Sequence, residues 1–400
     1  MSANGGMNPL LKEWGASFKA PTVYRVSNGT LRIQVQLMSL IAFAGLFALI
    51  LCVYYSHSTY NHVPAGFGPY ESNIYLKSLG KGLMYNNTYP LTPPVQTAQG
   101  IQYRIGIISD LDTNSKAPDN KSWLSYFKKG YLLWNPTFDQ ISIIWDSEKP
   151  TVLKSGYGLN GRGMELSELV VFDGKLLTVD DRTGIVYIVE NNMVIPWVVL
   201  MDGNGQSPKG FKSEWATVKD ETLYIGGMGK EWTSTTGEFL SYDPMWVKAV
   251  SNTGQVMHLN WTSNYMTLRR SLNIEFPGYM IHESGVWSEY HQRWFFLPRR
   301  SSHFKYDEVT DERMATNVLL STDSNFTNVM VTYIGEVIPT HGYSSFKFLP
   351  GTKDRVIVAL KSEEDKGRTA TYITAFTLAG TILVPETKIA DYKYEGLEFI

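Results

Sequence analysis

The chain has 400 residues, of which 43% are hydrophobic and 13% aromatic, and its formal net charge is −2. This composition is typical of a globular protein and excludes an intrinsically disordered chain or a coiled coil. Lys and Arg are scattered along the length. Because nucleic-acid binding requires clustered cations that contact phosphates, we expect no nucleic-acid partner.

An uncharged apolar run occupies residues 37–55, "LMSLIAFAGLFALILCVYY". A run of about 19 residues is long enough to cross a bilayer as a helix. Four cations and one acid precede it, and no charge follows until Glu71, which places the N-terminus in the cytoplasm. A cleaved signal peptide is the competing interpretation, but the leader is long and no small-x-small cleavage pattern follows closely. We therefore expect a cytoplasmic tail over 1–36, a type II signal anchor over 37–55 and a lumenal remainder.

The lumenal part has features compatible with the secretory pathway. The only cysteine, Cys52, lies inside the apolar run, so the folded domain has no disulfide and depends on core burial, with or without a metal. Four Asn-x-Ser/Thr sequons after the apolar run make glycosylation possible and begin at Asn86, Asn120, Asn260 and Asn325.

A β-rich domain is expected after a short stem. Residues 56–100 are rich in Tyr, Asn, Pro and Gly with little periodicity, which suits a stem. From residue 101 to 400, short apolar runs such as "YRIGIISDLD", "ELVVFDGKLLTVDD" and "DRVIVALKS" alternate with turn signals. Many short strands with few amphipathic helices indicate an all-β sandwich, barrel or propeller.

Weak internal repetition favours the propeller. Five stretches share a Ser or Glu, a short apolar strand, a polar turn and a second strand, and the last of them is the C-terminal "YKYEGLEFI". The aligned residues are 47, 69, 61 and 51 positions apart, close to one propeller blade plus loops, and are Ser167, Glu214, Glu283, Ser344 and Glu395. We predict a five-bladed β-propeller whose terminal strand closes the ring.

The five aligned residues have the chemistry of a calcium site. In a propeller the innermost strands line a central channel, so one oxygen donor from each blade would point at the axis. Calcium takes roughly six to eight oxygen ligands, and water molecules could complete the shell, whereas zinc prefers nitrogen and sulfur. The alternative is that these residues only begin strands and face solvent.

Two pairs of carboxylates follow apolar strands and open turns. "SDLD" contains Asp110 and Asp112, and "VDDRTG" contains Asp180 and Asp181. Like charges that converge at a channel mouth require a cation or raised pKa values. Simple Asx turns are the alternative interpretation, because Asp is a common turn former.

Arginines near these acids suggest phosphate chemistry. "GRGMELSEL" places Arg162 three residues before Glu165, and "FFLPRRSS" contains Arg299. The planar guanidinium matches phosphate oxygens in a bidentate manner, although a solvated surface charge is the simpler interpretation. Acids, arginines and a divalent metal together are what metal-assisted phosphoanhydride hydrolysis requires.

The longer motifs resemble a known family. "YRIGIISDLDTNS", "GRGMELSELVVFDGKLLTVDDRTGIVY", "KGFKSEWATVKDETLYIGGMGKEWT", "PGYMIHESGVWSEYHQRWFFLPRR" and "YKYEGLEFI" are similar to the soluble calcium-activated nucleotidases, or bed-bug-type apyrases, from about Tyr85 to Ile400. The resemblance implies a five-bladed propeller with central calcium that hydrolyses nucleoside di- and triphosphates to the monophosphate. It also implies an N-terminal anchor like that of animal members held in the endoplasmic reticulum or Golgi.

The resemblance also assigns residues. It implies that the five aligned residues bind calcium, and that the active-site acids and arginine are Asp110, Glu165, Asp181 and Arg299, with Asp112, Asp180 and Arg162 nearby. Two rival functions stay open at this point: a non-catalytic propeller that binds glycans or proteins, and a propeller glycosidase with paired carboxylates. The sequence does not decide whether the lumenal domain is released by cleavage or forms a homodimer.

Overall fold

The computed structural model describes residues 22–26, 29–33, 44–46 and 84–400. The chain divides into two compact units, Met1–Ala65 and Gly66–Ile400. In the first unit, β1 (Thr22–Val26) and β2 (Gly29–Ile33) form an antiparallel hairpin. Within the described ranges, no helix is long and apolar enough to cross a membrane. The predicted span over 37–55 lies outside the described residues except for residues 44–46, which are helical.

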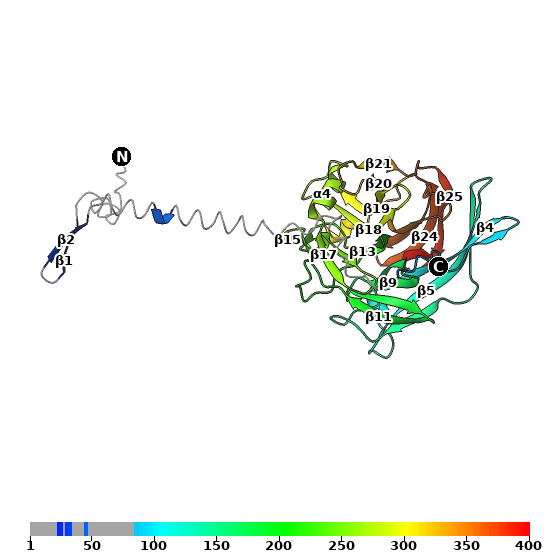
Figure 1. Ribbon diagram of the computed structural model, residues 1–400, viewed down its shortest axis with the longest axis horizontal. Coiled ribbons are helices and arrows are strands. Elements are labelled where there is room, and N and C mark those ends of the chain that lie inside the picture. Colours follow the sequence, from blue (N-terminus) through cyan, green and yellow to red (C-terminus); the bar gives the residue numbers. More distant parts are fainter. Residues whose placement is uncertain (1–21, 27–28, 34–43, 47–83) are drawn as a thin grey trace, which may run out of the picture. The chain divides into compact units, whose positions relative to one another are not determined.

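The second unit is a ring of five antiparallel sheets, which confirms the predicted five-bladed propeller (Figure 1). Blades 1 to 4 are numbered in chain order from residue 166, and blade 5 combines strands from both ends of the propeller. Blade 1 contains β8 (Leu166–Phe172), β9 (Lys175–Asp180), β10 (Ile185–Glu190) and β11 (Met193–Val199). Blade 2 contains β12 (Trp215–Lys219), β13 (Thr222–Gly226), β16 (Trp246–Val250) and β17 (Val256–Asn260). Blade 3 contains β18 (Tyr279–Ser288), β19 (Arg293–Ser302), β20 (Val318–Thr322) and β21 (Met330–Tyr333). Blade 4 contains β22 (His341–Phe348), β23 (Val356–Asp365), β24 (Arg368–Thr377) and β25 (Ile382–Ala390).

Blade 5 joins the two ends of the propeller. Its main strands are β26 (Tyr394–Phe399), β4 (Gly100–Ser109), β5 (Trp123–Asn135) and β6 (Gln140–Trp145), with β3 (Val95–Thr97) and β7 (Thr151–Ser155) at its edges. The C-terminal strand β26 pairs antiparallel with β4, with Leu397 opposite Ile107. A Cβ atom at Gly396 would lie 2.6 Å from the backbone of Glu168 in blade 1, so only glycine permits this close approach. The prediction that the terminal strand closes the ring is confirmed.

Five buried apolar clusters lie between neighbouring blades, one at each interface. Strand β8 shows how the sequence produces this arrangement. Leu169 and Val171 pack towards blade 5, whereas Val170 and Phe172 pack towards blade 2. Because alternate residues point to opposite faces and both faces are covered, the strand is a continuous apolar run, as strands buried on two sides are.

The loops add a few small elements. They are the short helices η1 (Asp112–Ser115), η2 (Asp243–Met245), α4 (Thr262–Arg270) and α5 (Glu308–Asp311), and a small sheet of β14 (Trp232–Thr233) and β15 (Phe239–Ser241). The innermost strands of the blades are β8, β12, β18, β22 and β26. The segment before each innermost strand reaches the same end of the channel, and this end carries the acids predicted from the sequence.

The last part of the predicted stem packs on the propeller. The backbone N–H of Asn86 donates to Asp173 Oδ1 at 2.8 Å, and Tyr89 Oη donates to Glu398 Oε1 at 3.1 Å. Residues Val95–Thr97 then form β3. The folded unit therefore includes residues upstream of the predicted start at residue 101.

Candidate active site and metal centre

The five predicted calcium ligands, hereafter the calcium ring, occupy equivalent places at one end of the innermost strands. Four of them lie where the pairing of an innermost strand with its neighbour shifts register: Ser167, Glu283, Ser344 and Glu395. Glu214 is the residue immediately before β12, and its backbone N–H donates to Gly226 O at 2.8 Å. Because a β-bulge redirects a side chain, this shared irregularity supports the alignment made from the repeats.

The calcium ring offers oxygen atoms from four buried residues and from Glu283, which is partly buried. Ser344 Oγ has no hydrogen-bond partner within the described structure, and Ser167 Oγ donates to Ser213 O at 2.7 Å, which leaves its lone pairs free. Burial raises the pKa of Glu214 to about 8 and holds the pKa of Glu395 well above its ordinary value. Carboxylates that resist ionisation in this way become stable anions once a cation binds beside them.

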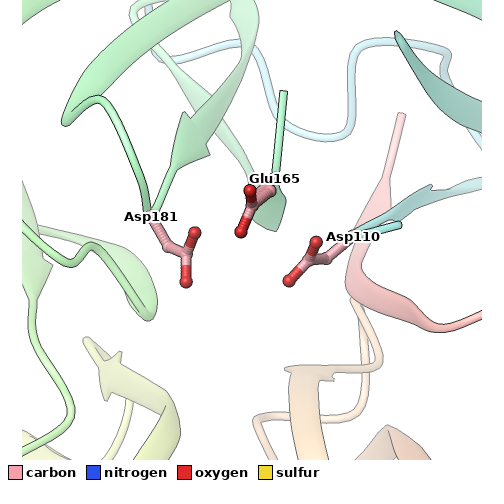
Figure 2. A group of neighbouring side chains, drawn as sticks. All are labelled: Asp110, Glu165 and Asp181. Atoms are coloured by element: carbon pink, nitrogen blue, oxygen red, sulfur yellow. The ribbon is translucent and has the colours of Figure 1, made fainter. Parts of the chain in front are cut away.

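Three acids form a second group next to the calcium ring, hereafter the acid cluster (Figure 2). Asp110 follows β4, Glu165 directly precedes β8, and Asp181 follows β9. One oxygen from each lies within 4.8 Å of the others, and all three residues are buried. Asp181 and Glu165 are held together because the backbone N–H of Asp181 donates to Glu165 O at 3.0 Å. The predicted convergence of acids from different blades is present in the structure.

Glu165 is the acid with the most distinctive protonation behaviour. Burial raises its pKa to about 7, even though arginine side chains oppose the shift. Arg162 donates to both carboxylate oxygens at 2.6 Å, and Arg182 donates to Oε2 at 3.2 Å. Glu165 is therefore poised to gain or lose a proton near neutral pH.

The two partner aspartates predicted from the sequence have different surroundings. Asp112 is 41% exposed, and its backbone N–H donates to Asp110 Oδ1 at 2.7 Å, which is an Asx turn. Asp180 is fully buried and accepts backbone N–H groups from Met164, Arg182 and Thr183, so its side chain orders the turn that carries Asp181. Asp180 lies outside the acid cluster.

Arg299, on β19, lies within the calcium ring. It forms ion pairs with Glu283, with Glu395 at 2.7 Å and with Glu364 at 2.7 Å. Burial alone would lower the pKa of Arg299, but these three carboxylates hold it well above its ordinary value. A Cβ atom at Gly342 would lie 2.4 Å from Arg299 Cγ, so this glycine makes room for the arginine.

Sequence reasoning missed two lysines at the centre of this region. Lys212 Nζ is 2.8 Å from Glu214 Oε1 and is also ion-paired with Asp181. Lys393 Nζ is 3.1 Å from Asp110 Oδ2. Each lysine lies two residues before a glutamate of the calcium ring, as Glu165 lies two residues before Ser167. This constant spacing of two residues from the aligned residue of a repeat could have identified both lysines from the sequence.

The residues present fit a divalent cation. The calcium ring supplies hard oxygen donors without nitrogen or sulfur, the ligand set that calcium prefers. In the network of ion pairs that joins the calcium ring and the acid cluster, eight carboxylates face five cationic side chains, which is an excess of three negative charges when every carboxylate is ionised. One divalent ion would offset most of this excess. The carboxylates are Asp110, Asp112, Glu165, Asp181, Glu214, Glu283, Glu364 and Glu395, and the cations are Arg162, Arg182, Lys212, Arg299 and Lys393.

Two places could hold the ion. Within the described residues, the acid cluster is the group whose carboxylate oxygens already lie close together. The glutamates of the calcium ring are held apart by Lys212 and Arg299, but they come from three blades around the channel and have two serine oxygens beside them. We favour the ring for calcium because it offers more oxygen donors, one from each blade around the channel.

A cavity of about 560 Å³ lies at the opposite end of the channel, away from the acid cluster. It is lined by the far ends of the innermost strands, including Val170, Thr217 and Lys347, and by residues 85–89. Size alone does not make it the active site, because the converging acids and cations lie at the other end.

The fold and the site define a β-propeller protein with a buried, metal-compatible carboxylate centre. The sequence profile of the Apyrase family matches residues 111–400, and the chain belongs to that family. It is 57% identical over 316 residues to soluble calcium-activated nucleotidase 1 of Rattus norvegicus, covering 79% of this chain and 78% of the relative. It is 53% identical over 353 residues to the Mus musculus protein of the same name, covering 88% and 87%. It is 48% identical over 317 residues to an apyrase of Cimex lectularius, covering 79% and 87%. The resemblance stated from the sequence is confirmed.

Proposed function

We propose that the protein hydrolyses nucleoside di- and triphosphates, such as UDP, GDP, ADP and ATP, to the monophosphate and phosphate, and that it requires calcium. The observation that carries this proposal is the acid cluster, which lies beside a ring of oxygen donors and several buried cations in a member of the Apyrase family. Names of close relatives support both the calcium dependence and the nucleotide substrates. A glycan-binding propeller and a glycosidase have no such support.

Calcium would be held by Ser167, Glu214, Glu283, Ser344 and Glu395. When bound, it would supply positive charge that offsets the phosphate oxygens. The protein's own cations would add to this effect, because an ammonium or guanidinium in a water-poor site stabilises charge that develops on a leaving phosphate. Arg299 is the guanidinium that we assign to this role.

Asp181 is the acid that we assign to the attacking water. Its Oδ1 has no hydrogen-bond partner within the described structure, whereas its Oδ2 is held by Lys212. Both oxygens of Asp110 are already engaged, one by the backbone of Asp112 and the other by Lys393. Asp181 thus has a free acceptor for a water proton, and Asp110 orients the lysine. We assign Asp112 and Asp180 to ordering the turns that present these two acids.

Glu165 is assigned to proton transfer near the departing phosphate. Its pKa of about 7 makes both protonation states available at neutral pH, the condition for efficient acid–base catalysis. Arg162 and Arg182 hold the carboxylate in place from two sides.

Phosphate release from UDP, GDP, ADP and ATP tests the proposal. We expect release with calcium, little with magnesium in its place, and none with a chelator. Absence of calcium-dependent release from every one of these nucleotides would contradict the proposed function.

We further propose that the protein is a single-pass type II membrane protein with its propeller in the lumen of the endoplasmic reticulum or Golgi. The charge asymmetry around residues 37–55 and the sequons support this placement. Removal of UDP left by glycosyl transfer would be a suitable role there. Protease protection of the propeller in intact microsomes, with a shift in size after glycosidase treatment, tests the topology, and full digestion of the propeller would contradict it.

A further inference from the structure

Lys212 and Lys393 occupy the same position in two of the five repeats. Each lies two residues before a glutamate of the calcium ring, at the start of an innermost strand. Their side chains are 23% and 7% exposed, which is unusual for lysine. A buried ammonium group is costly unless polar or charged groups compensate for its lost hydration, and both of these lysines have carboxylate partners.

Each ammonium joins the calcium ring to the acid cluster. Lys212 Nζ lies 2.8 Å from Glu214 Oε1 of the ring and is ion-paired with Asp181 of the cluster. Lys393 Nζ lies 3.7 Å from Glu395 Oε1 of the ring and 3.1 Å from Asp110 Oδ2 of the cluster.

Arg299 shows that this bridging is specific to the lysines. Arg299 contacts the ring glutamates Glu283 and Glu395, and it also contacts Glu364. Among the ion pairs of the described residues, it has none with the three acids of the cluster.

Calcium and these ammonium groups use the same carboxylates. A cation bound by Glu214 and Glu395 would weaken the hold of both glutamates on the lysines and add a like charge close by. The phosphates of a nucleotide at the acid cluster would supply the negative charge that the lysines then lack.

We propose that Lys212 and Lys393 couple calcium binding at the ring to phosphate binding at the acid cluster, by transferring their charge from ring glutamates to the phosphate oxygens of a nucleoside diphosphate. This inference rests on the proposed function and adds to it the residues through which calcium activates the site. Coupling of this kind is reciprocal: each ligand tightens the binding of the other by the same factor.

Binding measurements test the coupling without turnover. The full-length chain in detergent is titrated by calorimetry with a methylene-bridged nucleoside diphosphate, once in saturating calcium and once in chelator. We expect the unmodified chain to bind this analogue about tenfold or more tightly with calcium, within the usual range of such couplings. The coupling ratio is the affinity for the analogue in calcium divided by its affinity in chelator. In Lys212→Met and Lys393→Met, we expect the coupling ratio to fall towards one. Calcium alone should bind these variants at least as tightly as the unmodified chain, because a competing cation is gone.

Matched variants separate coupling from a structural role. Lys361 is a similarly buried lysine that pairs with Glu386 at 2.9 Å in blade 4, and Lys361→Met should leave the ratio unchanged. Lys212→Arg and Lys393→Arg keep the positive charge and should keep the ratio, so they can be used if a methionine variant does not fold.

Three results would overturn the inference. They are an unchanged ratio in both methionine variants, weaker calcium binding in both methionine variants, or loss of the ratio in both arginine variants. Failure of the unmodified chain to bind the analogue with calcium would instead contradict the proposed function.

Discussion

The channel of the propeller carries a cluster of buried charge at each end, and the two clusters are built differently. At the opposite end from the active site, Glu398 accepts hydrogen bonds from the backbones of Val171 and Phe399 and from Tyr89. Nearby, Glu168 accepts from Ser345 and pairs with Lys347 at 3.1 Å. Backbone, hydroxyl and ammonium groups of the protein therefore contact each of these carboxylates, although Glu168 Oε2 and Lys347 Nζ form an ion pair without hydrogen-bond geometry.

At the active-site end, the carboxylates are more numerous than at the opposite end, and they depend mainly on long side chains. Lys212, Arg299 and Lys393 are each shared among several acids. Strand pairing is irregular here, whereas β22 and β26 pair regularly towards the opposite end. The comparison supports our proposal that a metal and a substrate bind at the end where carboxylates share a few long cationic side chains.

Loss of the terminal strand should have the largest effect, because it removes parts of both ends. Deleting residues 392–400 removes β26, which carries Glu395 at one end and Glu398 at the other and closes blade 5. We expect loss of cooperative thermal unfolding, measured by circular dichroism, with or without calcium. A truncated chain that unfolds cooperatively near the temperature of the full chain would show that ring closure does not depend on β26.

Asp181→Asn should have the largest effect among single substitutions. Removing a general base typically costs about a hundred- to ten-thousand-fold in rate, and we expect phosphate release to fall within that range with calcium binding retained. Asp119→Asn is the control, since Asp119 lies on the surface paired with Lys154. Release within about twofold of the unmodified chain for Asp181→Asn would remove that residue from catalysis.

Glu395→Gln and Glu398→Gln compare the two ends directly on one strand. We expect Glu395→Gln to weaken calcium binding about tenfold or more, or about 1.4 kcal/mol, because a charged ligand becomes neutral. Glu398→Gln should leave the calcium affinity nearly unchanged. Calorimetric titration with calcium measures both, and equal effects of the two substitutions would contradict the division between the ends.

The pH dependence of calcium binding should be the smallest of these effects. Burial raises the pKa of Glu214 to about 8, so calcium must displace a proton below that pH. We expect calcium affinity to rise between pH 6 and 8. In calcium-free protein the same group should make stability fall as pH rises from about 4.5, where the unfolded chain ionises, to about 8. A calcium affinity that is flat across this range would contradict the raised pKa.

Much of the fold and part of the site could be predicted from the sequence, for identifiable reasons. The alternation of short strands and turns, together with the recurrence of one Ser or Glu per repeat, predicted the five blades and the equivalent places of the five aligned residues. These features are local or recur along the chain, so they can be recognised without the three-dimensional structure. The role of "YKYEGLEFI" as the closing strand followed from the same repeat.

Partners that come from different blades could not be predicted in this way. Glu364 joins the ion-pair network only because the propeller brings blades 3, 4 and 5 together at one end. Asp180 belongs to the same acidic motif as Asp181, but three backbone donors turn its side chain away from the acid cluster. Lys212 and Lys393 could have been predicted, because each lies two residues before a member of the calcium ring, as Glu165 does.

The location of the bound calcium tests the central claim most directly. Anomalous X-ray diffraction from crystals of the calcium-loaded propeller would place the ion without relying on activity. We predict a peak bounded by oxygens of Ser167, Glu214, Glu283, Ser344 and Glu395. A peak at Asp110, Glu165 and Asp181 alone, or at the opposite end of the channel, with none at the calcium ring, would contradict this account.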